Sequence, residues 1–483
     1  MSSRQFFSLF CAVFLLFAGY GLFLNSAGIK LAQMGVSNIA IGALNAAFFG
    51  GATISAIVSH RIISRVGHIR SFGVFGALFA IAAMAHMMFD SFWAWGGLRA
   101  LLGFCYFSLL MVVESWFTER SSADKRAKVL AIYEVVFYVA FTVGIALMSF
   151  KFSSNNIFTL AAILVMASML PVGLTRVAEP TIPPRQKISL PRVLAVAPLA
   201  TAGSFAAGIL INGFFTMASV FILQQGFNVR QISVYLGCAM FGGLISQIPV
   251  AYVSNRIGRR TTIMLCSAIP CAMAISALGV MQIQPSFIGI HYITAFIFGS
   301  CLFTLYSLSL ARANDVKPKL MNAVEINRSL LFVYGLGSLV APLLLGVVTE
   351  HANHFGFYSV YFMVTLALSV FAWLQKPIPP EERSVYVGMP ANGGTIIGDL
   401  DPRDDTMGNA TDAENHTEQA QQPFSGNLED GLSDKEVNDI DHSVSGSPEH
   451  DLPSTIIDQP TDGSDSTDNN NSAQVSPPSK DPA

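Results

Sequence analysis

Hydrophobic residues gather in twelve long stretches that short polar segments separate. Each stretch is close to the ~20 residues that an α-helix needs to cross the ~30 Å core of a bilayer. Backbone groups in lipid must be satisfied internally, so the pattern predicts helices. The twelve predicted spans are residues 6–27, 38–59, 70–89, 93–117, 129–150, 157–175, 198–224, 232–254, 261–281, 286–311, 322–348 and 356–375.

The chain also repeats itself weakly. Residues 31–55 return in register as residues 222–246, and Arg65-Val66-Gly67 returns at the same spacing as Arg256-Ile257-Gly258. A second segment, Cys105–Leu109, is similar in sequence to Cys301–Leu305. Two related halves in a membrane can rock about the plane between them, which is how many secondary transporters alternate access to a central site.

Composition supports a membrane domain followed by a different kind of segment. The chain is 52% hydrophobic and only 12% charged, whereas soluble domains carry about a quarter charged residues. Residues 377–483 hold 22 acidic and 4 basic residues and few aromatics, so we expect this segment to be disordered. We divide the chain into a six-helix bundle (1–176), a Pro-containing linker (177–197), a second six-helix bundle (198–376) and an acidic disordered tail (377–483).

Basic residues predict the orientation. Of the 24 Lys and Arg residues before the tail, 19 fall on the side of the N-terminus and only Lys30, Lys151 and Arg230 fall in loops on the other side. Positive charge concentrates in cytoplasmic loops, so both termini are expected to be cytoplasmic.

The sequence offers little for metal or covalent chemistry. All six cysteines lie in apolar stretches without a Cys-x-x-Cys pair, which favours packing roles. His351 and His354 lie beside Glu350, but two histidines without a third placed ligand are a weak metal signal. We find no phosphate-cradling loop and no nucleophile with a positioned base, so we expect no enzyme, no metal and no cofactor.

Several short sequence motifs match those of a known protein family. The loops after the second and eighth spans read Arg65-Val66-Gly67-His68-Ile69-Arg70 and Asn255-Arg256-Ile257-Gly258-Arg259-Arg260. Span four carries Arg99-Ala100-Leu101-Leu102-Gly103 and Val112-Val113-Glu114-Ser115. Spans eight and ten carry Gln247-Ile248-Pro249 and Phe303-Thr304-Leu305-Tyr306.

Over residues 1–376 the chain resembles the major facilitator superfamily, and more closely its YcaD-like branch of bacterial inner-membrane transporters. The resemblance implies two pseudo-symmetric six-helix bundles around a central site, a small-molecule substrate, proton coupling and a monomer, with no nucleic-acid partner. The chain has Ser64 and Asn255 where the superfamily usually has Asp, and His60 where it has the first Gly of that loop. These departures are expected to weaken a clamp between the helices or to move its anion elsewhere.

The two matching loops supply candidates for a cytoplasmic gate. Gly67 and Gly258 suit tight turns that need positive φ. The neighbouring arginines can reach helix C-terminal carbonyls or carboxylates such as Glu114 and Glu119, although binding to lipid headgroups remains an alternative. The gate candidates are Arg65, Gly67, Arg70, Arg256, Gly258 and Arg259.

Ionisable residues inside spans are expensive, so each is a candidate for the site or for coupling. Arg99 and Glu114 are 15 residues apart on span four, which puts them about 22 Å apart along the axis and on nearby faces. Function and structural bridging remain equal alternatives for this pair. A partly buried carboxyl such as Glu134 can take up and release protons near neutral pH.

Polar groups complete the list of candidates. Asn45, Asn212 and Gln247 need hydrogen-bond partners in a dry environment, and either a cavity or a neighbouring helix supplies them. Asn327 and Arg328 lie near the start of span eleven, where a local ion pair with the carboxyl three residues before Arg328 is favoured.

These observations predict a secondary active transporter that moves a small molecule by alternating access, with proton coupling. The alternative is a membrane sensor or scaffold of the same fold that acts through its acidic tail. The sequence does not indicate a substrate.

Overall fold

The computed structural model describes residues 3–121, 123–150, 154–175, 190–317, 323–384 and 386–388. Throughout these residues the regular structure is helical, and no strand occurs among them. They all belong to one compact unit, Met1–Gln421.

Among the described residues, twelve segments are long and apolar enough to cross a membrane, which confirms the predicted spans. The first six are α1 (Ser3–Gln33), α2 (Asn38–Val66), α3 (His68–Ala85), α4 (Phe92–Arg120), α5 (Ala123–Leu147) and α6 (Ser154–Leu174). The others are α8 (Pro198–Gln224), α9 (Val229–Ile257), α10 (Arg259–Ile283), α11 (Ile288–Leu302) with α12 (Leu305–Asp315), α13 (Ala323–Ala352) and α14 (Gly356–Leu374). Several helices, such as α1, α2 and α9, continue past the predicted ends, because a helix stops at a capping residue, whereas the bilayer sets only the length of its apolar part.

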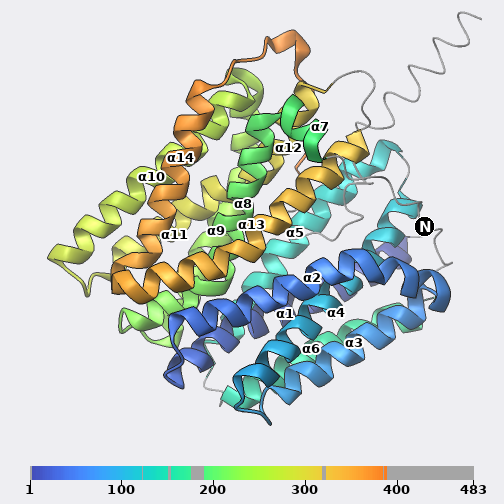
Figure 1. Cartoon of the computed structure of the whole chain (residues 1–483). Helices are drawn as coiled ribbons and strands as arrows, with labels where there is room; N and C mark the ends of the chain where they lie inside the picture. The colour runs from blue at the N-terminus through green and yellow to red at the C-terminus, as the bar shows by residue number, and fades with distance from the viewer. Residues whose placement is uncertain are drawn as a thin grey trace, which may run out of the picture. The chain divides into compact units, whose positions relative to one another are not determined.

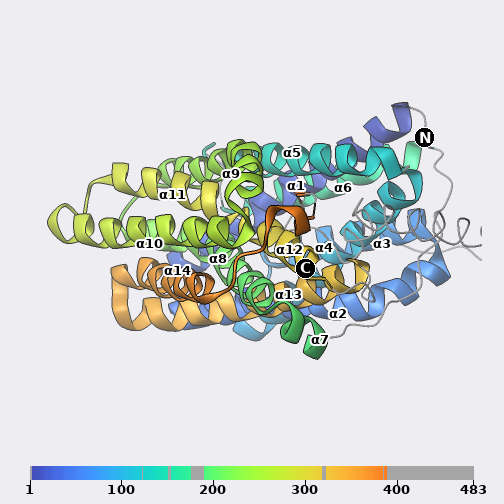
Figure 2. The ribbon, with the colours of Figure 1, turned by 90° about the horizontal axis from the view of Figure 1, so that it is seen from above.

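The helices form two groups that match the two halves of the sequence (Figure 1). In the N-terminal bundle α1 contacts α5 and α6, and α4 contacts α2 and α3. In the C-terminal bundle α8 contacts α12 and α13, α9 contacts α11, and α10 runs beside α14 (Figure 2). The bundles meet along a seam where α1 contacts α8, α2 contacts α13 and α5 contacts α9.

The sequence repeat is visible in the backbone. Gly35 and Gly226 have φ of 74° and 85°, and Gly67 and Gly258 have φ of 90° and 92°. Each pair has the spacing of the repeat, and these values suit glycine. Below, "basic end" means the end of the bundles with the turns at Gly67 and Gly258, and "opposite end" means the end with those at Gly35 and Gly226.

Close helix contacts repeat as well. Gly51 of α2 lies against the backbone of α4, and Gly103 of α4 lies against the backbone of α2, so that a Cβ at either position would clash. In the second half Gly242 of α9 and Gly299 of α11 make the equivalent contact. The glycines at these positions therefore let paired helices approach closely.

The tenth span is broken, which the hydrophobic pattern did not predict. The α-helix is interrupted at Phe303 and Thr304 and resumes with α12. The Thr304 hydroxyl donates to the carbonyl of Cys301 at 2.8 Å, a local side-chain bond that competes with the helical pattern.

The linker and tail differ from expectation at their described parts. The end of the predicted linker forms a short helix, α7 (Leu190–Val196), that contacts α8 and α13, while residues 176–189 lie outside the described part of the chain. Residues 377–384 and 386–388 pack on the bundles, so the expectation of disorder from residue 377 onward is wrong for them. The side chains of Arg383 and Ser384 donate hydrogen bonds to Asn255 and Asp315 at the basic end, and Val387 is buried. Residues 389–483 lie outside the described residues.

Candidate functional site

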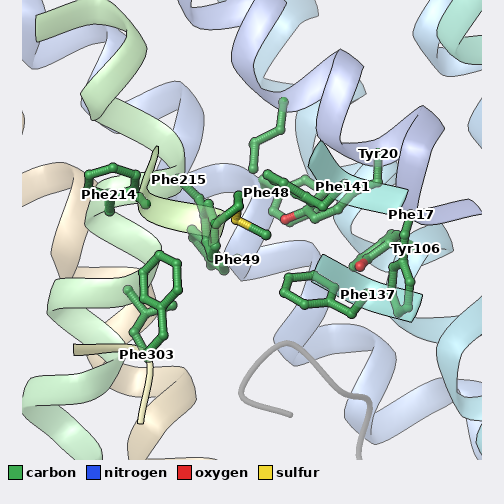
Figure 3. Close-up of a cluster of buried hydrophobic side chains, with 14 of the residues drawn as sticks. Phe17, Tyr20, Phe48, Phe49, Tyr106, Phe137, Phe141, Phe214, Phe215 and Phe303 are labelled. Atoms are coloured by element: carbon green, nitrogen blue, oxygen red, sulfur yellow. The ribbon is translucent and has the colours of Figure 1, made fainter. Parts of the chain in front are cut away.

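Aromatic rings fill the middle of the seam. Phe141 of α5 packs against Phe215 of α8 with ring centroids 4.9 Å apart, and Phe215 packs against Phe303 at the break in span ten, at 5.2 Å. Tyr138 of α5 stacks on Phe303 at 6.4 Å. Figure 3 shows Phe137 and Phe141 on one side of the seam and Phe214, Phe215 and Phe303 on the other. The rings make an apolar contact surface between the bundles.

The amide side chains of Asn45 and Gln247 cross the seam, and both are only partly satisfied. Asn45 of α2 donates to the carbonyl oxygen of Thr216 on α8 at 3.2 Å. Gln247 of α9 donates to the Tyr138 hydroxyl on α5 at 3.0 Å. The amide oxygens of Asn45 and Gln247 are buried and have no hydrogen-bond partner among the described residues. Buried acceptors without a hydrogen-bond partner are uncommon in the interiors of native proteins, so these two require an explanation.

The seam is closed by polar contacts at the opposite end. Gln224, the last residue of α8, donates to the side chain of Asn38, the first residue of α2, at 2.7 Å. The backbone N–H of Asn38 donates to the Glu350 carboxylate at 2.7 Å. Ser219 donates to the Asn25 carbonyl at 3.4 Å. Each of these bonds joins the N-terminal to the C-terminal bundle.

The structure gives Asn212 partners within its own bundle. Its side-chain nitrogen donates to the Tyr334 hydroxyl and to the Ser338 hydroxyl, both at 2.7 Å on α13. Asn212 therefore fastens α8 to α13. Asn327 is buried and Arg328 is half-buried near the start of α13.

Arg99 is a buried cation that forms no hydrogen bond with the described residues. Its side chain is 0% exposed, and its three guanidinium nitrogens have no hydrogen-bond partner in the described part of the chain. The guanidinium lies 5.5 Å from the ring centroid of Phe23 on α1. A cation–π contact offsets only part of the cost of burying a charge.

Glu114 is buried on the same helix but does not form an ion pair with Arg99 in the structure. The Tyr133 hydroxyl of α5 donates to its Oε1 at 3.1 Å. Between the two charges, Tyr20 and Tyr106 stack with centroids 3.8 Å apart. Arg99 and Glu114 are therefore interior groups of the N-terminal bundle.

Glu134 lies elsewhere, although it follows Tyr133 directly. Its side chain is 8% exposed and is one helical turn from Tyr138, a seam residue. A Cβ atom at Gly388 would lie 3.0 Å from Glu134 Oε2. The carboxyl group thus lies beside the first residues of the acidic tail.

In the second half, Arg259, one of the gate candidates, forms a clamp between α9, α10 and α12. Arg259 donates to Ser254 at 2.8 Å and to the Asn255 side chain at 2.7 Å, and its Nε lies 3.7 Å from Asp315 Oδ2 on α12. Asn255 thus supplies the acceptor expected of the usual Asp. Arg256 is exposed, with its guanidinium 4.7 Å from the ring centroid of Tyr252.

Asp315 was not among the carboxylates that the sequence predicted as partners of the gate arginines. The expected carboxylates were Glu114, which accepts from Tyr133, and Glu119, whose side chain lies outside the described residues. Asp315 follows Glu119 by 196 residues, the spacing that also relates Cys105 to Cys301. That spacing was the signal that would have found it.

The first half has no equivalent clamp among its described side chains. Arg65 and Arg70 are exposed, and neither forms an ion pair with a described residue as Arg259 does with Asp315. His68, which occupies the position of Arg259 in the repeat, is buried 5.9 Å from the ring of Trp116. The two halves therefore differ at the basic end.

Residues 376–384 and 386–388, here called the C-terminal strap, complete the basic end. Ser384 donates to Asp315 from its backbone nitrogen and from its hydroxyl, both at 2.7 Å, and its carbonyl accepts from Arg259 at 2.7 Å. Arg383 donates to the Asn255 carbonyl at 3.0 Å. The Arg259 guanidinium lies 5.5 Å from the ring centroid of Tyr386, whose pKa is raised by burial, so the phenol stays neutral.

Comparison with known proteins identifies the family. The family model of the Major Facilitator Superfamily matches residues 9–326. The chain belongs to this superfamily. It is 24% identical over 315 residues to the MFS-type transporter YcaD of Escherichia fergusonii, covering 64% of this chain and 80% of that one. It is 25% identical over 338 residues to YcaD of Salmonella arizonae, covering 69% and 86%.

Solved structures show the same fold. A crystal structure of the nucleoside transporter NupG matches with a TM-score of 0.61 and 14% identity, over 77% of this chain and 98% of that one. A bacterial homologue of the human lysosomal transporter Spinster, in an inward-facing and occupied conformation, matches with a TM-score of 0.59 and 13% identity, over 78% and 97%. The chain is therefore a multi-pass membrane protein with the fold of the Major Facilitator Superfamily.

Proposed function

We propose that this chain is a secondary active transporter that carries a small molecule by alternating access between its two bundles. The observation that carries the proposal is the pair of half-satisfied amides, Asn45 and Gln247, which link the bundles while their oxygens stay buried and without a partner among the described residues. A permanent interface would be expected to satisfy these acceptors.

The chemistry of the seam fits a moving interface. Each cross-seam hydrogen bond contributes about 0.5–1.5 kcal/mol, so a substrate or a modest rearrangement can replace it. The aromatic rings of Phe141, Phe215 and Phe303 can slide or separate without leaving a polar group unpaired. The broken tenth span places irregular backbone at the same level, a feature found where transporter helices line a site.

Glu134 is the proposed proton carrier. It is the buried carboxyl beside the seam residue Tyr138, and protonation removes its charge from an environment where charge is costly. Arg99 and Glu114 are proposed to act from the interior of the N-terminal bundle. A change in charge at the site alters their electrostatic environment through the stacked rings of Tyr20 and Tyr106.

The basic end is proposed to face the cytoplasm of a bacterial cell, with both termini inside. The support is the positive-inside distribution of Lys and Arg. In this arrangement the described conformation is closed toward the outside by Gln224, Asn38 and Glu350. We propose that the monomer is the transporting unit.

Flux into proteoliposomes tests the proposal. Compounds that raise the melting temperature of the purified protein are selected first, because a ligand that binds the folded state stabilises it. Their counterflow is then measured for the wild type and for Glu134→Gln. Protein-dependent counterflow supports transport, and loss of the pH dependence in Glu134→Gln with retained counterflow supports proton coupling.

A chain that lacks residues 389–483 separates the transporter from the scaffold. A carrier keeps its counterflow after this truncation. A protein that produces no counterflow of any stabilising compound, with or without the tail, contradicts the proposal.

A further inference from the structure

We propose that the cavity at the opposite end of the α5–α9 seam is a binding site for an anionic group, either a carboxylate or a phosphate. The inference concerns binding and does not require that transport be demonstrated. The cavity has a volume of about 860 Å³, which lies in the range of small-molecule sites. Its polar lining residues are Ser26, Lys30, Gln33, Ser149, Asn228 and Arg230.

The charged residues of this lining are all basic. Lys30 at the end of α1 and Arg230 in the first turn of α9 both line the cavity, and no Asp or Glu of the described residues does so. The 29-residue helix α9 also begins here, and its N-terminus adds positive potential. The lining therefore favours a negative ligand.

The two cations are exceptions to the distribution of charge along the chain. Before the acidic tail, only three basic residues fall on the side away from the N-terminus, and two of them, Lys30 and Arg230, come from different bundles to the same cavity. Topology alone gives no reason for positive charge here, since the positive-inside rule disfavours it. A bound anion gives such a reason.

Ser26 provides a second, independent indication. Its side chain is 6% exposed, it lines the cavity, and its hydroxyl has no hydrogen-bond partner among the described residues. An unused hydroxyl at the wall of a cationic cavity is suited to donate to an anion.

The positive potential continues inward. The Lys30 ammonium lies 5.4 Å from the ring centroid of Phe158, and Phe158 lies 5.3 Å from Phe23. The buried guanidinium of Arg99 lies on that second ring, at 5.5 Å. A pair of aromatic rings thus separates the cavity from a third cation, Arg99.

Phosphate binding to purified full-length protein in nanodiscs tests this site. Inorganic phosphate is titrated at constant ionic strength, and the shift in melting temperature gives an apparent affinity. The variants are Lys30→Gln and Arg230→Gln, with Lys30→Arg and Arg230→Lys as charge-preserving rescues. Arg61→Gln, an exposed residue of α2, is the matched control.

Loss of one cation is expected to weaken phosphate binding roughly tenfold, and the rescues and Arg61→Gln are expected to keep it. Nanodiscs of phosphatidylcholine alone, compared with nanodiscs that contain phosphatidylglycerol, distinguish the two sources of the anion. Phosphate binding in phosphatidylcholine indicates a free anion. Stabilisation that requires phosphatidylglycerol and is lost in the Gln variants indicates a lipid headgroup. A wild type that responds to neither anion, or Gln variants that respond as the wild type does, overturns the proposal.

A second inference rests on different contacts. We infer that the C-terminal strap is a latch that covers Glu134 at the basic end. Its anchor is the set of bonds among Ser384, Asp315 and Arg259 in the C-terminal bundle. Its far end, Gly388, reaches Glu134 in the N-terminal bundle. The strap therefore bridges the bundles next to the proposed proton carrier, and its release exposes that position to water.

Two truncations that differ by four residues test the latch. One chain ends at Gly388 and the other at Ser384, so both lack the acidic tail and only the second lacks the part of the strap at Glu134. Glu134→Cys is introduced into each, and its reaction with a maleimide is followed by peptide-resolved mass spectrometry. The chain that ends at Ser384 is expected to react several-fold faster.

Asp315→Asn in the longer chain provides a further measurement, because it weakens the anchor without shortening the strap. Faster labelling of Glu134→Cys is again expected. Equal labelling rates in the two truncated chains overturn the latch, and so does unchanged labelling in Asp315→Asn.

Discussion

The side-chain amide of Gln247 donates a hydrogen bond of 3.0 Å to the hydroxyl of Tyr138 and so ties α9 of one bundle to α5 of the other. A neighbouring glycine, Gly243, lies close to the same tyrosine ring. The contact is short and specific, but the amide oxygen of Gln247 remains without a partner among the described residues. This contact therefore suits an interface that forms and breaks.

Removing the Tyr138 hydroxyl is expected to shift the balance between conformations. Tyr138→Phe keeps the ring but loses one cross-seam bond of about 0.5–1.5 kcal/mol, so the population closed at the opposite end should fall several-fold relative to the alternative. Double electron–electron resonance between labels on the two bundles measures the populations. Tyr252→Phe, an exposed tyrosine of α9, is the control, and an unchanged distribution in Tyr138→Phe would contradict this role.

Arg99→Met is expected to stabilise the protein while it impairs its activity. Replacing a buried charge by an apolar side chain of similar length is often neutral or stabilising by about 1–4 kcal/mol, and this guanidinium has no hydrogen bond to lose among the described residues. Thermal unfolding and counterflow are measured on the same preparation. A lower melting temperature in Arg99→Met would show that the guanidinium has a structural role, and Arg61→Met controls for the loss of charge.

Gly51 and Gly50 are neighbours with opposite expected tolerance. A Cβ at Gly51 would collide with the backbone of α4, whereas one at Gly50 meets open space. Gly51→Ala should therefore cost about 1–3 kcal/mol or more, as overpacking does, and Gly50→Ala should cost little. Melting temperatures of the two variants check the prediction, and equal values would refute it.

Asp315→Asn is expected to destabilise the C-terminal bundle. It leaves the buried Arg259 without its carboxylate, and breaking a buried ion pair typically costs about 3–5 kcal/mol. The remaining bonds of Arg259 to Ser254 and Asn255 should reduce the loss. Asp90→Asn, an exposed acid after α3, provides the comparison in thermal unfolding, and equal stability of both variants would argue against the clamp.

Much of the fold follows from local rules that a sequence displays. The twelve spans follow from the length of apolar stretches, and the turns at Gly67 and Gly258 follow from a repeat that places glycine where φ is positive. The family follows from short motifs in a fixed order.

The candidate site depends on contacts between distant segments, and these were only partly predictable. Gln247 donates a hydrogen bond across the seam, as expected of a polar residue that faces the space between the bundles. Asn212 instead donates to Tyr334 within its own bundle. The spacing of residues along a helix cannot distinguish these two outcomes. The partner of Arg259 was missed because Asp315 lies at the end of an apolar span. The strap was missed because Ser384 and Val387 lie at the start of a segment whose composition predicts disorder.

The most direct test of two bundles that rock about a seam is a pair of distances measured in nanodiscs. Spin labels on unnatural amino acids at Met34 and Ile283 report on the opposite end, and labels at Arg61 and Arg256 report on the basic end. Rocking of the bundles predicts a second population in which the Met34–Ile283 distance is longer and the Arg61–Arg256 distance is shorter, and that population should increase in Tyr138→Phe. Single, unchanged distributions at both ends, in acidic and neutral buffer and in the variant, would contradict rocking about the seam.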